Sequence, residues 1–259
     1  MSGGLALLWI VVLANLVVGT LIGISGIAGF LLPITFSGFL GMPVTDALAL
    51  SFLSFITSGI LGTWSYHRSG NLDWKLGLPL CLGSLAGALL GVKLNLLIPV
   101  DAAKVLLYAV VLLSGLSVLL KKEKADRNTA SGGALHNPVV LVLLGLVTAA
   151  ICSLTGAGGP VLVVPLLAVL GVDLRVAVGV SLLDSAAIAL PACVGYLSHA
   201  TLDNLVPLAV GSVLAHGAGV LLGAKLSGRV NLKLLRLLVG LLSVGAACYM
   251  LLKLFLSYL

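Results

Sequence analysis

Apolar runs of about 20 residues follow one another through nearly the whole chain and leave no stretch for a polar domain. Only 8% of the 259 residues are charged and 60% are hydrophobic, whereas soluble domains carry about 25% charged residues. A helix needs about 20 apolar residues to cross the hydrocarbon core of a bilayer. We therefore predict an all-α, polytopic integral membrane protein whose chemistry lies in or at the bilayer.

An internal repeat with an offset of about 130 residues further constrains the fold. The stretch LGMPVTDALALSFLS (40–54) matches LGVDLRVAVGVSLLD (170–184). Two residues later in register, GALLGVKL (87–94) matches GVLLGAKL (219–226). The chain therefore contains two tandem copies of one helical unit.

The two copies are separated by a polar segment with the composition of a solvated linker. The predicted organisation is a first transmembrane repeat at 1–120, a cytoplasmic linker at 121–137 and a second repeat at 138–259. Each copy is expected to form a long helix, a Gly-rich break, a short helix and three full spans. In the first copy these helices are expected at 5–24, up to Leu40, 45–66, 74–96 and 101–120. In the second they are expected at 138–155, up to 170, 175–198, 203–227 and 231–257.

The positive charges indicate how the two copies are oriented. If each long helix and its short partner made one crossing together, the 14 Lys and Arg residues would divide equally between the two sides. If the long helix and its short partner instead enter the membrane and return to the side on which they began, eleven of the Lys and Arg residues face the linker side and three face the other side. Positive charge collects on the cytoplasmic side of membrane proteins, which favours the second arrangement. We expect inverted repeats in the cell (inner) membrane, with both termini outside.

The two Gly-rich breaks are the first candidate for a binding site. Secondary transporters with inverted repeats bind their substrates near the midplane, at interrupted helices. Glycine lets backbone approach a ligand closely, and the positive end of a helix that starts after a break favours an anion. The alternative is that these glycines only allow close packing. The candidate substrate-binding residues at the breaks are Ser25, Gly26 and Gly29 in the first copy, and Thr155, Gly156, Gly158 and Gly159 in the second.

Two ionisable residues lie well inside predicted spans and are candidates for proton coupling. Asp184 and His216 correspond to Ser54 and Ser84 in the first copy, so only the second copy carries titratable groups at these positions. Ionisable groups at membrane depth are functional candidates by default, although each could instead make a structural hydrogen bond to a neighbouring helix. Ser51 and Ser181 are candidate hydroxyl donors to the substrate, unless they bond their own backbone.

Other residues favour a structural role. Small residues recur every fourth position at Gly83, Gly87 and Gly91 and again at Ala215, Gly219 and Gly223, a pattern typical of close helix contacts. Trp64, Tyr66, Trp74 and Tyr196 flank predicted loops and are expected to lie at the membrane interface. Asp46 is expected to cap or nearly cap the helix that follows Pro43.

The sequence resembles the sulfite exporter TauE/SafE family over nearly its whole length. The family's Gly-rich segment, apolar run and Pro are present as GAGGPVLVVP (156–165) and, more weakly, as GIAGFLLP (26–33), where Ile27 replaces a usual Gly. The resemblance implies a secondary transporter that exports sulfite or a small organosulfonate, driven by protons. Its expected partners are a small inorganic or organosulfur anion, protons, membrane lipid and a second copy of the chain.

Two other functions fit parts of the sequence. A passive anion channel would need no proton-linked residue. A rhomboid-like intramembrane protease would use Ser25 as nucleophile and His216 as base, but one active site would not explain the duplication. The composition offers no basic stripe for nucleic acid, and the four cysteines lie singly, without metal-ligand spacing. We expect no enzyme, no cofactor and no metal site.

Overall fold

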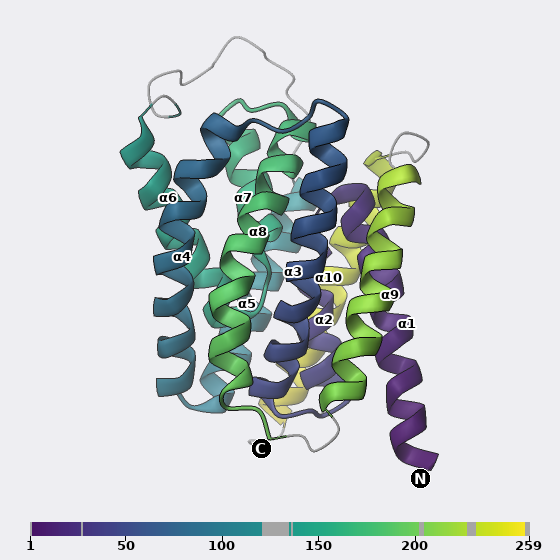
Figure 1. Ribbon diagram of the computed structural model, residues 1–259. Helices are drawn as coiled ribbons and strands as arrows, with labels where there is room; N and C mark the ends of the chain where they lie inside the picture. Colours follow the sequence, from purple (N-terminus) through teal and green to yellow (C-terminus); the bar gives the residue numbers. More distant parts are fainter. Residues whose placement is uncertain are drawn as a thin grey trace.

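The computed structural model describes residues 2–26, 28–120, 135, 137–201, 205–226 and 232–256. Its described residues form helices joined by short loops, with no strand among them (Figure 1). Most of the predicted linker, with Asp203, Arg229 and Ile27, lies outside the described residues. The helices are α1 (Ser2–Ser25), α2 (Leu31–Pro33), the π-helix η1 (Ile34–Phe39), α3 (Val44–Arg68), α4 (Trp74–Leu97), α5 (Val100–Leu120), α6 (Pro138–Thr155), α7 (Gly159–Val169), α8 (Leu174–Leu197), α9 (Leu205–Leu226) and α10 (Leu232–Leu256).

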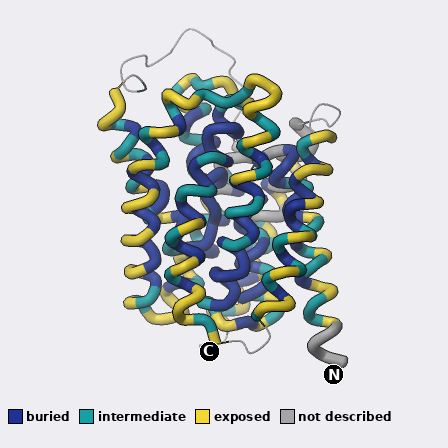
Figure 2. The backbone as a smooth tube through the Cα atoms, viewed as in Figure 1, coloured by how far each residue is buried: buried dark blue, intermediate teal, exposed yellow. Residues whose placement is uncertain are grey.

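Six of the helices in the described ranges are long and apolar enough to cross a membrane, namely α1, α3, α4, α6, α8 and α9. The all-helical, multi-pass fold predicted from the apolar runs is therefore confirmed. Figure 2 shows buried residues concentrated along the middle of the bundle and exposed ones around its outside. Many of the exposed side chains are leucines, such as Leu82, which is 66% exposed. An apolar outer face of this kind suits contact with lipid tails rather than water.

The central helices α3 and α8 occupy equivalent positions in the two copies and run antiparallel. A Cβ added to Gly59 would meet Ala186, and one added to Gly62 would meet Leu182, so the numbering rises along one helix as it falls along the other. Figure 1 agrees, because α3 begins at the end of the bundle where both termini lie and α8 begins at the opposite end.

The fourth helix of each copy packs on the other copy. Helix α4 lies against α6 and α8 of the second copy, whereas α9 lies against α1 and α3 of the first. Helices α5 and α10 pack against each other. The two copies are therefore interleaved. Helices α3 and α8 lie between α4 and α9, which we call the exchanged helices because each packs on the other copy.

Glycines make the contacts of the exchanged helices unusually close. Cβ atoms at Gly83 and Gly87 would collide with the backbone carbonyls of Val142 and Leu146 on α6, and one at Gly219 with the carbonyl of Leu16 on α1. The predicted small-residue seams are therefore confirmed as close helix contacts.

Two structural predictions about polar residues are wrong. Asp46 does not cap α3, and its buried carboxylate instead accepts hydrogen bonds from the backbone N–H of Thr201 at 2.8 Å and from the Thr201 hydroxyl at 3.0 Å. Tyr196 does not lie at the surface. It is fully buried, and its ring stacks on Phe52 at 5.7 Å.

Candidate functional site

The Gly-rich break of the second copy lies between α6 and α7 and depends on left-handed glycines. Gly156 ends α6 with φ of 74°, and Gly158 precedes α7 with φ of 79° and ψ of 145°. Side chains with a Cβ rarely adopt these conformations, and that of Gly158 is almost confined to glycine. In the first copy, Gly26 follows α1 with φ of 73°. Both interrupted helices predicted from the sequence are therefore present.

The two breaks meet at the centre of the bundle, with Phe55 between them. A Cβ added to Gly29 would lie 3.1 Å from the Phe55 ring and 3.5 Å from the carbonyl oxygen of Ala157. A Cβ added to Gly158 would lie 3.3 Å from the same ring. Phe55 itself is 2% exposed and packs edge-on against Phe52. The breaks of the two copies are thus neighbours, and one aromatic ring of α3 fills the space between them.

Side chains from two other helices hold the end of α6 at the break. The Tyr196 hydroxyl donates to the Ser153 carbonyl at 2.8 Å, and the Asn95 amide donates to the Leu154 carbonyl at 2.6 Å. The last carbonyls of a helix have no partner within it, so these bonds satisfy groups that would otherwise be unpaired. Tyr196 comes from α8 and Asn95 from α4, so the break is held by both copies.

The predicted hydroxyl donors mostly bond their own helices. Ser51 donates to the Ala47 carbonyl and Ser181 to the Val178 carbonyl, and both serines are fully buried. Thr155 donates to the Ile151 carbonyl and accepts from the Ala157 N–H. Hydroxyls bonded in this way keep lone pairs but have no free proton for a ligand. The Ser25 side chain lies outside the described residues, and Gly159 packs on the backbone of Ser185.

His216 lies in a buried polar group of side chains that we call the amide cluster, formed by Asn15, Ser54, Ser212 and His216. Asn15 donates to the Ser212 hydroxyl at 3.0 Å and accepts from the Ser54 hydroxyl at 2.8 Å. His216 follows Ser212 by one turn of α9. All four residues are fully buried, yet neither ring nitrogen of His216 has a hydrogen-bond partner among the described residues.

Asp184 lies in the corresponding place in the other copy, which we call the carboxylate cluster, formed by Asp184, Ser84 and Thr148. Ser84 faces Asp184 but donates to the Gly145 carbonyl at 3.1 Å, and Thr148 donates to the same carbonyl. Asp184 is fully buried, and neither of its carboxylate oxygens has a partner among the described residues.

The two clusters are related by the sequence repeat. An offset of 130 residues pairs Asn15 with Gly145 and Ser54 with Asp184, and an offset of 132 pairs Ser84 with His216. The amide cluster lies among α1, α3 and α9, and the carboxylate cluster lies among α4, α6 and α8. Asp184 and His216 therefore occupy different clusters and make no hydrogen bond to each other.

The register of α1 and α9 argues against a Ser25–His216 pair. A Cβ at Gly19 would meet the His216 backbone, and one at Gly23 would meet that of Val220. Ser25 is therefore about 9 Å further along the helix than the level of His216, at a rise of 1.5 Å per residue. Within the described residues, no three His, Cys, Asp or Glu side chains come together as metal ligands would.

The sequence reasoning missed Asn15 and Phe55. Asn15 is the one amide in the long apolar run of α1, and that isolation was the available signal. Phe55 has no such signal, because an aromatic residue in an apolar span looks like any other packing residue. Only the folded chain brings its ring between the two breaks.

Comparisons with known proteins agree with this architecture. The sulfite exporter TauE/SafE family model matches residues 10–250. A probable membrane transporter protein of Bacillus subtilis (strain 168), YdhB, is 27% identical over 225 residues, which cover 83% of this chain and 89% of that protein. No solved structure matches. Because the family match spans nearly all of the interleaved helices and both breaks, the chain belongs to the sulfite exporter TauE/SafE family of membrane transporters.

Proposed function

We propose that the protein is a secondary transporter that exports a small anion such as sulfite or an organosulfonate, coupled to protons, with its site between the two Gly-rich breaks. The observation that carries the proposal is that both breaks meet at Phe55, at the centre of the bundle. Irregular backbone at membrane depth is tolerated where it lines a cavity or is covered by protein. Two such segments from two copies of one unit are typical of a substrate site in a transporter.

The helix that starts at the second break supports an anion as the substrate. Helix α7 begins at Gly159, and no side chain caps its N-terminus. The N-terminus of a helix carries partial positive charge and exposes backbone N–H groups. A small oxyanion seated at the break would be stabilised by both.

The antiparallel central helices support alternating access between two inverted copies. Helices α3 and α8 carry equivalent residues but run in opposite directions. The conformation that is open toward one side of the membrane is then close in energy to the conformation that is open toward the other side. With the positive charges facing the cytoplasm, both termini lie outside the cell membrane.

The unpartnered groups of the two clusters support proton coupling. Asp184 and His216 are fully buried without hydrogen-bond partners among the described residues. Burying an unpaired charge is costly, so a change in the charge of either group would favour different packing around it. Gain or loss of a proton would in this way bias the helices that enclose the breaks.

Flux measurements in proteoliposomes test the proposal. We expect wild-type protein to move sulfite and methanesulfonate, and an imposed pH gradient to stimulate the flux about tenfold, within the usual range of coupling between two sites. Methanesulfonate stays ionised at neutral pH, so its response to the gradient reports on the protein. Asp184→Asn and His216→Ala should abolish the stimulation.

Matched variants distinguish a specific loss of proton coupling from general damage to the fold. His67→Gln changes an exposed histidine, and Asp73→Asn keeps a residue type that caps the N-terminus of α4, so both should retain gradient-driven flux. Flux that ignores the gradient and both cluster variants would show a passive channel. If the wild type carries neither anion, the transport proposal is wrong.

A further inference from the structure

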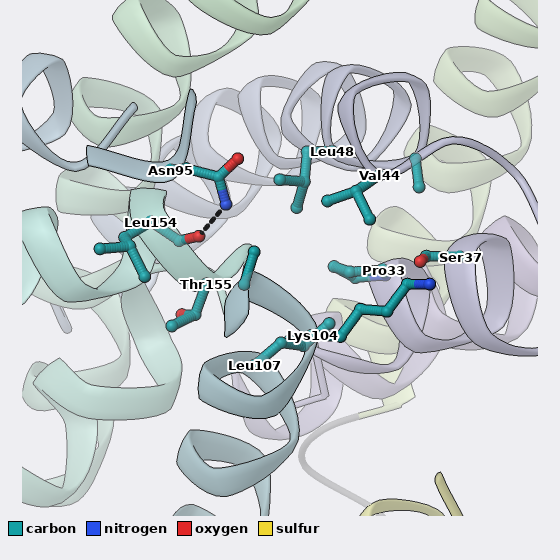
Figure 3. Close-up of a pocket in the computed structure, with 11 residues that line it drawn as sticks. Pro33, Ser37, Val44, Leu48, Asn95, Lys104, Leu107, Leu154 and Thr155 are labelled. Carbon is teal, nitrogen blue, oxygen red and sulfur yellow. Dashed lines mark hydrogen bonds between the residues drawn. The ribbon is translucent and has the colours of Figure 1, made fainter. Parts of the chain in front are cut away.

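A small pocket lies beside the break at Gly156 and is lined in part by Thr155, the last residue of α6. It lies between η1, the start of α3, the end of α4, the start of α5 and the end of α6 (Figure 3). Its walls include Pro33, Leu48 and Thr155. Pro33 and Leu48 also touch the break directly, because a Cβ added to Gly156 would meet both side chains. The pocket is thus continuous with the wall of the proposed substrate site.

Ser37 presents an unsatisfied hydroxyl to this pocket. The residue is only 8% exposed, and its Oγ has no hydrogen-bond partner among the described residues. Figure 3 shows the hydroxyl directed into the pocket. A buried hydroxyl without a partner costs stability, so the fold alone gives no reason for it.

The fold does not need a hydroxyl at this position. The repeat pairs Ser37 with Leu167 in the second copy. Leu167 is fully buried in an apolar cluster with Leu80, Val163, Ala177 and Val180. One copy therefore fills this place with hydrocarbon, and the other keeps a polar group there.

A cation lies on the opposite wall. The Lys104 side chain extends along the pocket toward Ser37 (Figure 3). It is 29% exposed, and its nearest carboxylate, Asp101, is 3.9 Å from Nζ. That separation is too long for a hydrogen bond, and the carboxylate is half-exposed to solvent. The ammonium therefore keeps donors for another partner, and its charge selects an anion.

We propose that this pocket is an anion-binding subsite, in which the Lys104 ammonium and the Ser37 hydroxyl donate to one small oxyanion on its way between the break and the side of the termini. The proposal rests on the proposed function, because it takes the transported anion as the ligand. Asn95 and Thr155 are also polar lining residues, but the Asn95 amide already donates to the Leu154 carbonyl and the Thr155 hydroxyl to the Ile151 carbonyl, so both hold the end of α6.

The pocket accepts the anion when Lys104 swings outward. Its open space is about that of one water molecule, which is too small for sulfite while the lysine stem crosses it. Lys104 is partly exposed and has a flexible four-carbon stem. Most of the other lining residues are buried side chains of packed helices, so the lysine is the movable part.

Equilibrium binding of radiolabelled sulfite and methanesulfonate to the full chain in nanodiscs tests this subsite. We expect Lys104→Met and Ser37→Ala each to raise the apparent Kd about tenfold, as the loss of a hydrogen bond to a charged ligand should. Lys93→Met removes an exposed lysine from the end of α4, at the same end of the bundle. Thr35→Val removes a hydroxyl of η1 that already donates to the Leu31 carbonyl. Both controls should stay within twofold of wild type.

The outcomes separate this inference from the proposed function. If Lys104→Met and Ser37→Ala bind and transport both anions like wild type, the subsite is wrong and the transporter stands. An equal loss in Lys93→Met would also overturn the subsite, because it would reflect surface charge in general. If wild-type protein neither binds nor transports either anion, both proposals fail.

Discussion

At the scale of single residues, the buried polar side chains divide by whether the fold satisfies them. Asn15 and Asp46 are fully buried, and both make hydrogen bonds to distant parts of the chain. Asp184, His216 and Ser37 are buried without partners among the described residues. The first kind stabilises the native packing, whereas the second kind costs stability and is therefore a better indicator of a site.

Removing the Asp46 carboxylate should destabilise the protein. Asp46→Ala loses the bonds from the Thr201 N–H and hydroxyl, and we expect a loss of about 1–3 kcal/mol, seen as a lower melting temperature in detergent. The matched variant Thr201→Val removes one of the same bonds. If the pair is responsible, the double variant should lose less than the sum of the two singles. Strictly additive losses would contradict this account.

Sequence reasoning placed Asp184 and His216 correctly inside spans but misjudged Tyr196 and Asp46. A polar residue near a helix end has the same sequence signature whether it faces the membrane interface or a neighbouring helix. The Tyr196 hydroxyl reaches Ser153, 43 residues away in sequence, and Asp46 reaches Thr201, 155 residues away. Partners that distant depend on how the helices assemble, which periodicity does not describe.

At the scale of elements, the helix bounds follow the apolar runs closely, but the short segment of the first copy differs from expectation. In place of one short α-helix, the chain forms α2 and then the π-helix η1. Pro33 has no N–H, and Leu32 N–H already bonds the Gly29 carbonyl at 3.1 Å. The following bonds shift register, so that Leu40 N–H bonds the Thr35 carbonyl five residues back.

The break at Gly158 should be intolerant of any side chain. Gly158→Ala forces a Cβ into a backbone conformation that costs about 1–3 kcal/mol for residues other than glycine, and the new Cβ meets the Phe55 ring. We expect a lower melting temperature and a large loss of anion flux. Gly245→Ala is the control, because a Cβ there meets nothing within 4 Å. If the two variants have the same melting temperature and the same anion flux, the break is not part of the substrate site.

At the scale of the whole molecule, the sequence predicted two copies and a linker but not which helices exchange. Both copies carry the same small-residue seams, and the pattern of a seam does not show which helix it will pack against. The packing of α4 on α6 and of α9 on α1 emerges only in the assembled bundle. The meeting of the two breaks at Phe55 has the same cause, since it requires α1, α3 and α6 to be in place together.

The orientation of the bundle gives a test at this scale. Helix α1 begins and α10 ends at the same end of the structure (Figure 1), and we propose from the distribution of positive charge that this end faces outside. Alkaline phosphatase fused to the C-terminus should be active, and green fluorescent protein in the same place should be dark. A reporter inserted in the 121–137 linker should show the reverse. A fluorescent C-terminal fusion would overturn the orientation.

The exchange of α4 and α9 also has a consequence for how the protein is made. Membrane helices enter the bilayer in the order in which they are synthesised, and α4 is complete before α6 exists. Its glycine seam therefore faces lipid until the second copy arrives, and the first copy stays without the helix that covers α1. The final packing of either copy therefore requires helices of the other, so the bundle is completed only after both copies have been made.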